Sequence, residues 1–433
     1  MNPIPKPTGA TARRALEALA RERHILAALE AVHDDLGDVF QLPLPGFSPV
    51  MVAGPEAARF ILAGGRHSFL WRAEQDPVTR LLRHGLLVED GSFHDMLRRE
   101  MRPSLHKGMV ASYVETMWRC TDQITGSWQE GAEVDLLVEM RRIALLILTQ
   151  TLYKADFRPH LDALWSAILR AIRYISPGPW LIWRGVPRPG YRRALQRLDA
   201  YLYQLIAARR ASLGEADDLL GVLIASGMAE GLIRDQLLTL LIAGHDTSTA
   251  LLAWTLYLLT THREAYARVQ EEVDGALGAA APTLSATGQL GYLEQVIKEA
   301  LRLYPPIHLG SRIAARDVEF QGHRIPAGTR VLYSIYLTHR HKAHWEAPRR
   351  FDPERFSAEN ERQRAPYTFL PFGGGPRNCI GTAFAQVEAR IVLARVMQQF
   401  ELRFAGEHVR PHMGATLEPH PGVRVAVQRR RRP

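Results

Sequence analysis

One of the two cysteines of this 433-residue chain lies in a glycine-rich loop, shortly after an arginine. The run reads Phe372-Gly-Gly-Gly-Pro-Arg-Asn-Cys379-Ile-Gly381. Backbone N–H groups of glycines and a nearby cation stabilise the charged form of a thiol, so this loop suits a thiolate. Such a thiolate could act as a nucleophile, as a redox sensor or as an axial ligand of iron.

The other cysteine, Cys120, lies in a helix-like stretch and is expected to be a buried, unreactive thiol. Two cysteines cannot build a disulfide framework, an all-cysteine zinc site or an iron–sulfur site. Of the two cysteines, Cys379 is therefore the one expected to react or to bind a metal.

A second polar group interrupts a segment that is otherwise apolar. Leu237–Leu259 is apolar nearly all round, which predicts a buried helix, yet its middle reads Ala243-Gly-His-Asp-Thr-Ser248. A carboxylate in such a helix is costly unless it is paired or functional. Thr247 can donate its hydroxyl to the carbonyl of Ala243, and Gly244 can leave room for a small ligand. The alternative is a buried polar kink without a catalytic role.

A third pattern joins two distant segments. Glu299 and Arg302 are three residues apart and share one face of a helix that must end near Tyr304, because two prolines follow. A lone pair of this kind is usually a surface salt bridge. The segment Pro353-Glu-Arg-Phe356 supplies a further cation, Arg355.

These patterns together resemble the motifs of the cytochrome P450 family, in the family's order. The spacing F-x-x-G-x-R-x-C-x-G matches the heme-thiolate loop, Ala243–Ser248 matches the oxygen-activation motif, and the Glu299–Arg302 pair matches the E-x-x-R pattern. The resemblance implies the P450 fold, which is mainly α with a small β-rich part. It also implies heme b between the helix that bears Asp246 and the helix that begins near Gly381.

The resemblance assigns roles residue by residue. Cys379 would be the axial ligand of the heme iron, Asp246 would relay protons, and Thr247 would hold dioxygen. A buried network would brace the cysteine loop, through Glu299, Arg302 and Arg355. Further heme contacts would come from Ala243, Gly244, Phe372, Arg377 and Gly381. Cations for the two propionates would come from His94, Arg98, Arg312 and Arg377. For Arg98 a solvated helix face is the alternative, because Arg99 and Arg102 flank it.

The implied reaction is the insertion of one oxygen atom from O2 into an apolar molecule, such as a terpenoid, a steroid, a fatty acyl chain or a polyketide-like compound. Family positions place the substrate near seven residues, which are Phe69, Trp71, Trp180, Ile307, His308, Ala415 and Thr416. Fold and motifs do not fix the substrate.

The chain lacks a flavin or nicotinamide motif, so electrons are expected from a ferredoxin or flavodoxin with its reductase. Arg99, Arg102 and Lys107 are candidates for its docking face by resemblance. Two other functions stay open: a heme-thiolate peroxygenase, isomerase or dehydratase, and a non-enzymatic heme sensor. The intact Asp246-Thr247 pair counts against the first, and no appended effector region is visible for the second.

Composition and charge exclude other classes. The net charge of +9 could suggest nucleic acid, but no interleaved aromatic and basic motif supports it. No run of roughly eighteen apolar residues and no signal-peptide core appear, so we expect a cytoplasmic protein without a transmembrane segment. A monomer is a separate expectation. The pattern H-x-H-x-x-H of His339, His341 and His344 is interpreted as surface or capping histidines.

The expected organisation is a single domain over residues 1–433. Helices dominate about 55–305, and β-rich parts cover about 37–54, 306–335 and 402–428. One amphipathic surface helix is predicted over Ala12–Ala31. Residues 69–76 and 176–191 are predicted as long loops, the second being either a lid over an apolar pocket or part of the core.

Overall fold

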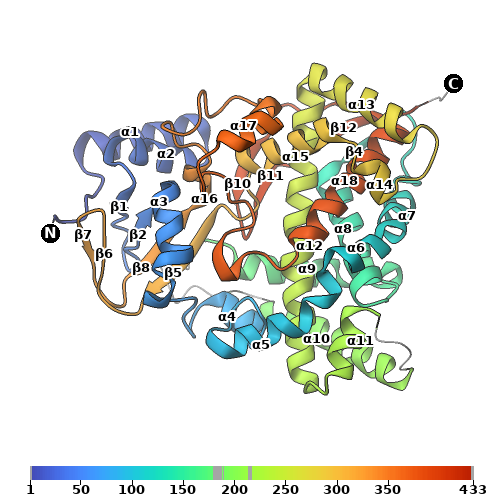
Figure 1. Cartoon of the computed structure of the whole chain (residues 1–433), viewed down its shortest axis with the longest axis horizontal. Coiled ribbons are helices and arrows are strands. Elements are labelled where there is room, and N and C mark those ends of the chain that lie inside the picture. Colours follow the sequence, from blue (N-terminus) through green and yellow to red (C-terminus); the bar gives the residue numbers. More distant parts are fainter. Residues whose placement is uncertain (1, 179–187, 189, 213–216, 431–433) are drawn as a thin grey trace.

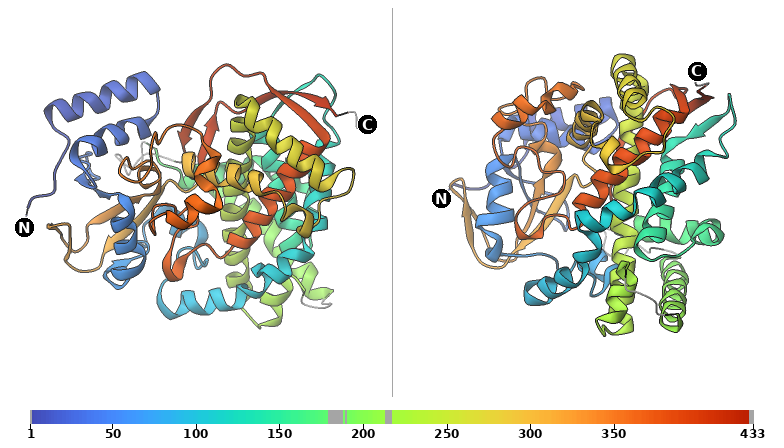
Figure 2. Two further views of the ribbon diagram at one scale, coloured as in Figure 1. Left: turned by 45° about the horizontal axis from the view of Figure 1, so that its top comes forward. Right: turned by 45° about the vertical axis from the view of Figure 1, so that its right-hand side comes forward.

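The computed structural model describes residues 2–178, 188, 190–212 and 217–430. Helices fill one side of the molecule, and a smaller sheet with the N-terminal helices fills the other (Figure 1). Two further directions of view show the same division (Figure 2). The described chain is therefore mainly α with a small β-rich part, as the sequence predicts.

The helices follow the chain in order. The first half holds α1 (Gly9–Glu22), α2 (Ile25–Leu36), α3 (Gly54–Arg59), α4 (Pro77–Leu82), α5 (Gly91–Met101), α6 (Lys107–Ser112), α7 (Val114–Thr125), α8 (Leu136–Leu152), α9 (Leu161–Ile175) and α10 (Tyr191–Ala211). The second half holds α11 (Leu219–Ala225), α12 (Glu230–Thr261), α13 (Arg263–Leu277), α14 (Leu284–Thr287), α15 (Gly291–Leu303), α16 (Ile335–Thr338), α17 (Ala358–Gln363) and α18 (Thr382–Gln399).

Helix α12 is the central element of the helical side. It packs on α8, α10, α15 and α18, so nearly all of its faces are covered. This explains why its sequence is apolar all round rather than along one stripe. By length and composition α12 could cross a membrane, but 83% of the stretch concerned is buried inside the protein, as expected of a core helix.

In the described part of the chain the strands form four small sheets. They are β1 (Val39–Gln41), β2 (Val50–Val52), β3 (Phe69–Leu70), β4 (Glu133–Asp135), β5 (Leu309–Ala314), β6 (Val318–Phe320), β7 (His323–Ile325), β8 (Arg330–Ser334), β9 (Phe400–Phe404), β10 (Arg410–Met413), β11 (Leu417–His420) and β12 (Arg424–Arg429). The largest sheet has the order β1-β2-β8-β5-β3, with β2 and β8 parallel and its other neighbours antiparallel. The smaller sheets are β4-β12-β9, β10-β11 and β6-β7.

The three predicted β-rich parts hold all strands except β3 and β4. Both exceptions lie in the part predicted to be helical, and both are edge strands that join distant segments. Strand β3 pairs with β5, and β4 pairs with β12. With two or three residues each, they are too short to show an alternating pattern.

The predicted single helix over Ala12–Ala31 is wrong. The structure has two helices there, because Arg23 adopts a left-handed backbone with φ of 55° and ends α1. His24 then caps α2, its Nδ1 accepting a hydrogen bond from the Ala27 N–H at 3.2 Å. The second helix is not a surface helix, since Leu26, Ala27 and Leu29 are buried.

Two helix ends that matter for the site lie where the sequence places them. Helix α15 ends at Leu303, with Tyr304 as its C-cap before the two prolines. Helix α18 begins at Thr382, with Gly381 as its N-cap. The N-terminus of α18 therefore lies just after Cys379.

Candidate active site

A large cavity separates α12 from the cysteine loop. Its volume is about 1570 Å³, and its lining is mostly apolar. One wall is the middle of α12, including Ala243, Gly244, Asp246 and Thr247. The loop around Cys379 and the first turn of α18 line the same cavity. The structure thus brings together the two motifs that lie more than a hundred residues apart in the sequence.

The cysteine loop is fixed by its backbone. The Cys379 N–H donates to the Phe372 carbonyl at 2.9 Å, which closes the loop. Gly375 has a φ of 66°, and a Cβ there would lie 2.1 Å from the Leu62 carbonyl oxygen. No other residue type fits this position without moving the backbone.

The Cys379 thiol is accessible because it faces the cavity, while protein surrounds it on its other sides. This burial raises the pKa of the Cys379 thiol. Hydrogen bonds from the Gly381 N–H and the Thr382 side chain, together with the charge of Arg98, favour the thiolate and limit that rise in pKa. A metal ion bound to the sulfur would remove the proton outright.

Four predicted propionate ligands line the cavity, namely His94, Arg98, Arg312 and Arg377. Arg98 donates to Asn378 Oδ1 at 2.8 Å, and Arg377 donates to Asp90 Oδ1 at 2.8 Å. Arg312 is buried, and burial lowers its pKa. The alternative of a solvated face for Arg98 is not observed, since its side chain reaches the cavity.

Two further residues of this cationic cluster were not assigned to it from the sequence. The Trp71 ring lies between the guanidinium groups of Arg312 and Arg377, at 3.4 and 4.3 Å from its centroid. Arg72 is half-buried and lines the cavity beside Arg312, and its pKa is lowered to about 10, first by burial and then by the charge of Arg312. Trp71 was expected to contact substrate, and Arg72 belongs to no motif.

This cluster tests whether the cavity suits heme. Trp71 Nε1 and Arg72 Nε are buried and have no hydrogen-bond partner among the described residues. Buried N–H donors are normally paired, and a cluster of cations calls for anions. Two carboxylates would satisfy both needs. The residues present therefore fit a heme whose propionates lie at this end of the cavity.

The polar interruption of α12 has the predicted local geometry. Thr247 Oγ1 donates to the Ala243 carbonyl at 2.8 Å. Gly244 lines the cavity, but its missing side chain makes room for Leu148, whose Cδ1 would lie 2.4 Å from a Cβ. The expectation that Gly244 leaves space for a ligand is thus corrected, because α8 takes that space.

Asp246 is buried but has partners that the sequence did not reveal. Arg141 of α8 lies 3.1 Å from its Oδ1, and Thr416 donates to its Oδ2 at 2.8 Å. Arg141 also pairs with Glu418 of β11. Burial raises the pKa of Glu418 to about 7, Arg141 opposes this rise, and Asp246 adds to it. Thr416 was expected to touch substrate; it lines the cavity and also holds the carboxylate.

A second buried acid lies behind α12. Glu388 of α18 accepts a hydrogen bond from the Ser248 hydroxyl. Burial raises the pKa of Glu388 to about 8, with the Ser248 bond opposing the rise. This side chain is therefore largely protonated at neutral pH. Nothing in the sequence pattern singled it out, because Glu388 falls on an ordinary helical stretch.

The predicted network of Glu299, Arg302 and Arg355 is present. Arg302 forms two hydrogen bonds with Glu299, of 2.7 and 2.8 Å, and both side chains are fully buried. Arg355 Nε lies 3.5 Å from Glu299 Oε1. The same carboxylate oxygen accepts a hydrogen bond from the Asp352 N–H at 2.9 Å. Burial raises the pKa of Glu299, while Arg302 works against that rise.

This network also reaches the segment that leads into the cysteine loop. Arg302 donates to the carbonyls of His339, Pro348 and Arg350, at 3.0, 2.7 and 3.1 Å. The Leu370 N–H in turn donates to His339 Nε2 at 2.9 Å. A continuous chain of bonds therefore runs from α15 to Leu370, two residues before Phe372.

The predicted substrate residues divide into three groups. Ile307, His308, Ala415, Thr416 and Trp71 line the cavity. Phe69 does not, because it is a buried residue of β3 that packs edge-on against Phe60, with ring centroids 5.5 Å apart. Trp180 lies outside the described residues, as does most of the predicted loop 176–191.

Cys120 is buried in α7, as expected, and burial raises its pKa to about 12. It does not line the cavity. Cys379 is therefore the thiol available to the cavity, opposite an acid and an alcohol on a central helix. This arrangement defines a heme-thiolate enzyme.

The chain belongs to the cytochrome P450 family, since the family model described as Cytochrome P450 matches residues 5–424. Cytochromes P450 hold heme iron through a cysteine thiolate, so the protein is a heme-thiolate monooxygenase. The resemblance noted in the sequence is thereby confirmed for family, fold and cofactor.

Curated relatives support the same assignment. The chain is 31% identical over 419 residues to the putative cytochrome P450 139 of Mycobacterium tuberculosis, covering 93% of this chain and 97% of that protein. It is 32% identical over 400 residues to cyclooctat-9-en-7-ol 5-monooxygenase of Streptomyces melanosporofaciens, covering 88% and 85%. It is 30% identical over 429 residues to cyclooctatin synthase of the same organism, covering 95% and 92%.

A solved structure agrees in fold. The crystal structure of the cytochrome P450DA heme domain superposes with a TM-score of 0.88 at 28% sequence identity. The superposition covers 100% of this chain and 98% of that chain. The division into a helical side and a sheet side is thus that of a P450 heme domain.

Proposed function

We propose that this monooxygenase inserts one oxygen atom of O2 into a terpenoid, with electrons from a separate redox protein. One observation carries the proposal: Cys379 and the Asp246–Thr247 pair line one mostly apolar cavity. Two relatives are named for cyclooctat-9-en-7-ol and cyclooctatin, and these names favour a terpenoid over a steroid, fatty acyl or polyketide-like substrate.

The lining of the cavity supports an assignment of the residues that would hold heme b. Cys379 would bind the iron, while Phe372, Gly381, Ala243 and the backbone of Gly244 would contact the macrocycle. The propionates would be held by His94, Arg98, Arg312 and Arg377, together with the unpartnered donors of Trp71 and Arg72. Heme held by a cysteine thiolate would supply the activation of dioxygen and cleavage of the O–O bond.

On the α12 side, Asp246 would relay protons and Thr247 would hold dioxygen. The Thr247 hydroxyl hydrogen is donated to the Ala243 carbonyl, which leaves its oxygen able to accept a hydrogen bond from a ligand in the cavity. Asp246 would carry a proton on a carboxylate oxygen by leaving Arg141 or Thr416 for a moment. Ile307, His308 and Ala415 would contact the substrate, whose fit decides which C–H bond is presented.

Electrons would arrive on the side of α5 and α6. Arg99, Arg102 and Lys107 are exposed there and would attract an acidic ferredoxin or flavodoxin, itself reduced by its own reductase.

We further infer that the chain is one domain that acts as a monomer in the cytoplasm, without contact to nucleic acid.

Two other functions are separable by one assay. A peroxygenase would work with peroxide alone, an isomerase or dehydratase would need no electrons, and a sensor would turn nothing over. The preserved Asp246–Thr247 pair, with Arg141 and Thr416 holding the acid, favours use of O2.

The test is turnover of a terpenoid panel with NAD(P)H and a surrogate ferredoxin system, beside peroxide alone and no reductant. Candidate substrates are first chosen by the shift of the Soret band on binding. We expect product only with the electron supply, labelled by 18O2. Product without electrons, or without the label, would contradict the proposal. The reduced carbon monoxide complex should show the red-shifted thiolate band, and Cys379→His should abolish it.

A further inference from the structure

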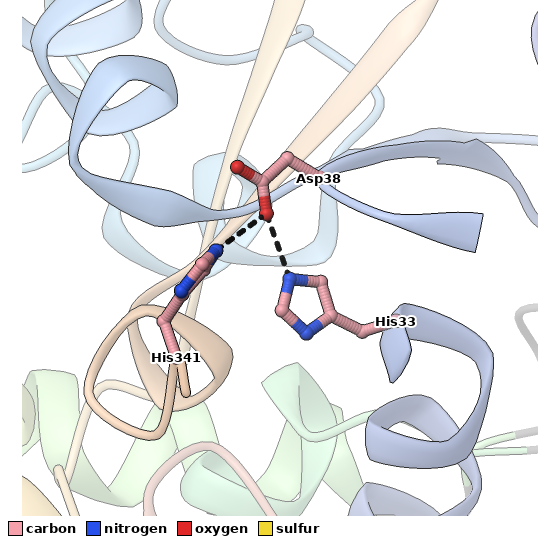
Figure 3. A group of neighbouring side chains, drawn as sticks. All are labelled: His33, Asp38 and His341. Carbon is pink, nitrogen blue, oxygen red and sulfur yellow. Dashed lines mark hydrogen bonds and ion pairs between the residues drawn. The ribbon is translucent and has the colours of Figure 1, made fainter. Parts of the chain in front are cut away.

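Two histidines and an aspartate from distant parts of the chain meet outside the cavity (Figure 3). His33 lies in the last turn of α2, Asp38 precedes β1, and His341 follows α16. None of the three lines the cavity, and the proposed reaction uses none of them. We call them the His33–Asp38–His341 cluster.

The donor atoms of the cluster converge. His33 Nε2 lies 2.8 Å from Asp38 Oδ1, and His341 Nε2 lies 3.1 Å from the same oxygen. The two rings meet edge to face with centroids 5.2 Å apart. All three groups can offer a ligand atom within 4.8 Å of the others. Figure 3 shows both rings turned toward the one carboxylate.

The backbone fixes each member of the cluster. Gly37 ends α2 by donating to the His33 carbonyl at 2.9 Å, so Asp38 follows the helix directly. The Asp38 carbonyl accepts from the Ala53 N–H at 2.9 Å. Gly54 lets the carboxylate approach, since a Cβ there would lie 2.8 Å from Asp38 Oδ2.

The backbone of His341, the third member of the cluster, is also fixed by hydrogen bonds. The His341 carbonyl accepts hydrogen bonds from the N–H groups of His344 and Trp345, at 2.9 and 3.0 Å. Side-chain exposure is 11% for His33, 22% for Asp38 and 17% for His341. The cluster is thus largely enclosed, yet an ion can reach it from solvent.

This donor set is one that zinc prefers. Imidazole nitrogen and carboxylate oxygen bind Zn²⁺ at about 2.0–2.2 Å, and tetrahedral ligands are then roughly 3.3 Å apart. The observed separations of 2.8 and 3.1 Å need to widen by only a few tenths of an ångström. Three protein ligands would leave one position for water.

The ring N–H hydrogens of the two histidines do not prevent an ion from binding. In the absence of a metal ion the Nε2 hydrogens are donated to Asp38, and binding an ion requires them to move to Nδ1. His341 Nδ1 accepts from the exposed Ala343 N–H at 3.2 Å, and water can replace that acceptor.

We propose that His33, Asp38 and His341 form a site for a divalent ion of the zinc type, independent of heme. The bound ion would tie α2 and the start of β1 to the segment after α16. The contact spans 303 residues between Asp38 and His341, so it would stabilise the junction of the N-terminal part with the rest.

The site differs from the H-x-H-x-x-H pattern in the sequence. His339 is buried and accepts the Leu370 N–H through Nε2, so it cannot offer that nitrogen to an ion at the cluster. His344 is exposed, with its ring centroid 4.9 Å from that of His341. Only His341 of the three belongs to the cluster, and its partners come from the N-terminal part.

The test uses the heme-loaded protein with any affinity tag removed and with metal stripped by a chelator. Zinc titration against a chromophoric chelator should give one site per chain. His33→Ala and His341→Ala should each weaken affinity by at least about tenfold, and Asp38→Asn should weaken it less. Zinc should raise the thermal midpoint of the wild type by several degrees and that of the alanine variants by none.

His412→Ala is the matched control, because His412 and His420 form another close ring pair, with centroids 5.6 Å apart. Unchanged zinc affinity in this variant supports the proposal. Equal loss in the control, or equal zinc affinity in all variants, overturns it. Far-UV circular dichroism and the heme spectrum show whether each variant is folded.

A measurement on the wild type alone guards against variants that fail to fold. Crystals grown with zinc and measured at its absorption edge should show an anomalous peak between the three side chains. No peak, or a peak only elsewhere on the surface, overturns the site.

Discussion

At the residue scale, the acid on α12 is the side chain whose chemistry depends most on its neighbours. Asp246 is held by Arg141 on one oxygen and by Thr416 on the other. Arg141 is shared with Glu418, whose pKa of about 7 makes its charge variable near neutral pH. Arg141 thus interacts with two carboxylates, and in the proposed mechanism proton delivery by Asp246 would depend on how strongly each of them binds this cation.

Asp246→Asn removes the proton-carrying oxygen and keeps an oxygen that can accept the Thr416 hydrogen bond. We expect turnover with the ferredoxin system to fall by about 100-fold, the scale of general acid catalysis, with heme content unchanged. Product formation and NAD(P)H consumption measure the loss. Thr416→Val is the control for positioning and should cost less. An asparagine variant with wild-type turnover would show that the proton takes another path.

Glu388 offers a second residue-scale prediction, which concerns stability. Its pKa is raised from the usual 4.5 to about 8, so the folded state binds more protons than the unfolded state between these values. The free energy of unfolding should therefore fall as pH rises from about 5 to 8. Glu388→Gln removes the ionisable group and keeps a partner for Ser248.

We expect Glu388→Gln to flatten that fall and to raise the free energy of unfolding at pH 8 by roughly 1–3 kcal/mol. Denaturant unfolding of the heme-loaded protein at pH 5, 6, 7 and 8 measures it. If the wild type and the variant lose stability in parallel over this range, Glu388 does not carry the change.

At the element scale, the pair on α15 ties the helix to the loops that carry the heme ligand. Arg302 bonds Glu299 twice and the carbonyls of His339, Pro348 and Arg350, and His339 then bonds Leu370. Removing one partner of a buried ion pair costs about 3–5 kcal/mol, because the other charge is left without compensation. The backbone carbonyls cannot replace a carboxylate.

Glu299→Ala should therefore yield heme-free protein or aggregate. The yield of soluble protein and the ratio of heme to protein absorbance measure this. Glu361→Ala is the matched control, because Glu361 pairs with Lys298 at 2.9 Å but stays partly exposed. It should keep its heme. A folded, heme-loaded Glu299→Ala protein would contradict the structural role.

The sequence predicts those features of the site that depend on residues within a few positions of one another, and it misses those that depend on the packing of distant segments. The Thr247 bond to Ala243, the end of α15 before two prolines and the Cys379 loop follow from residues within a few positions. Arg72, Arg141, Glu388 and Glu418 are ordinary residues of their own segments. They come close to the site because α8, α18 and β11 pack around α12 and because the loop after β3 lines the same cavity. Likewise β3 and β4 exist because β5 and β12 offer them an edge.

At the scale of the whole molecule, the proposed docking of an electron-donating protein depends on surface charge. Arg98 links the interior to this face, since it lines the cavity and bonds Asn378 beside Cys379. Arg99, Arg102 and Lys107 continue outward from the same region and are exposed. Charged patches of this kind act mainly on the rate of encounter, and salt weakens their effect.

Replacing Arg99 and Arg102 by glutamate should slow reduction by an acidic ferredoxin by roughly tenfold or more at low ionic strength. Stopped-flow reduction under carbon monoxide measures the rate. The difference from the wild type should shrink as salt is added, because surface charges are screened over about 10 Å at 0.1 M. Dithionite reduction and substrate binding should not change, since both side chains are exposed and neither lines the cavity.

The matched control reverses charge elsewhere, at Arg13 and Arg21 of α1, which are exposed on the opposite, sheet side of the molecule. The control has the same net charge as the test variant, so it separates a local docking face from a general effect of the +9 charge. Equal slowing by both variants would mean that the whole molecule's charge steers the partner. Slowing by the Arg99 and Arg102 variant alone would place the partner near the end of α5, where Arg98 bonds Asn378 beside Cys379.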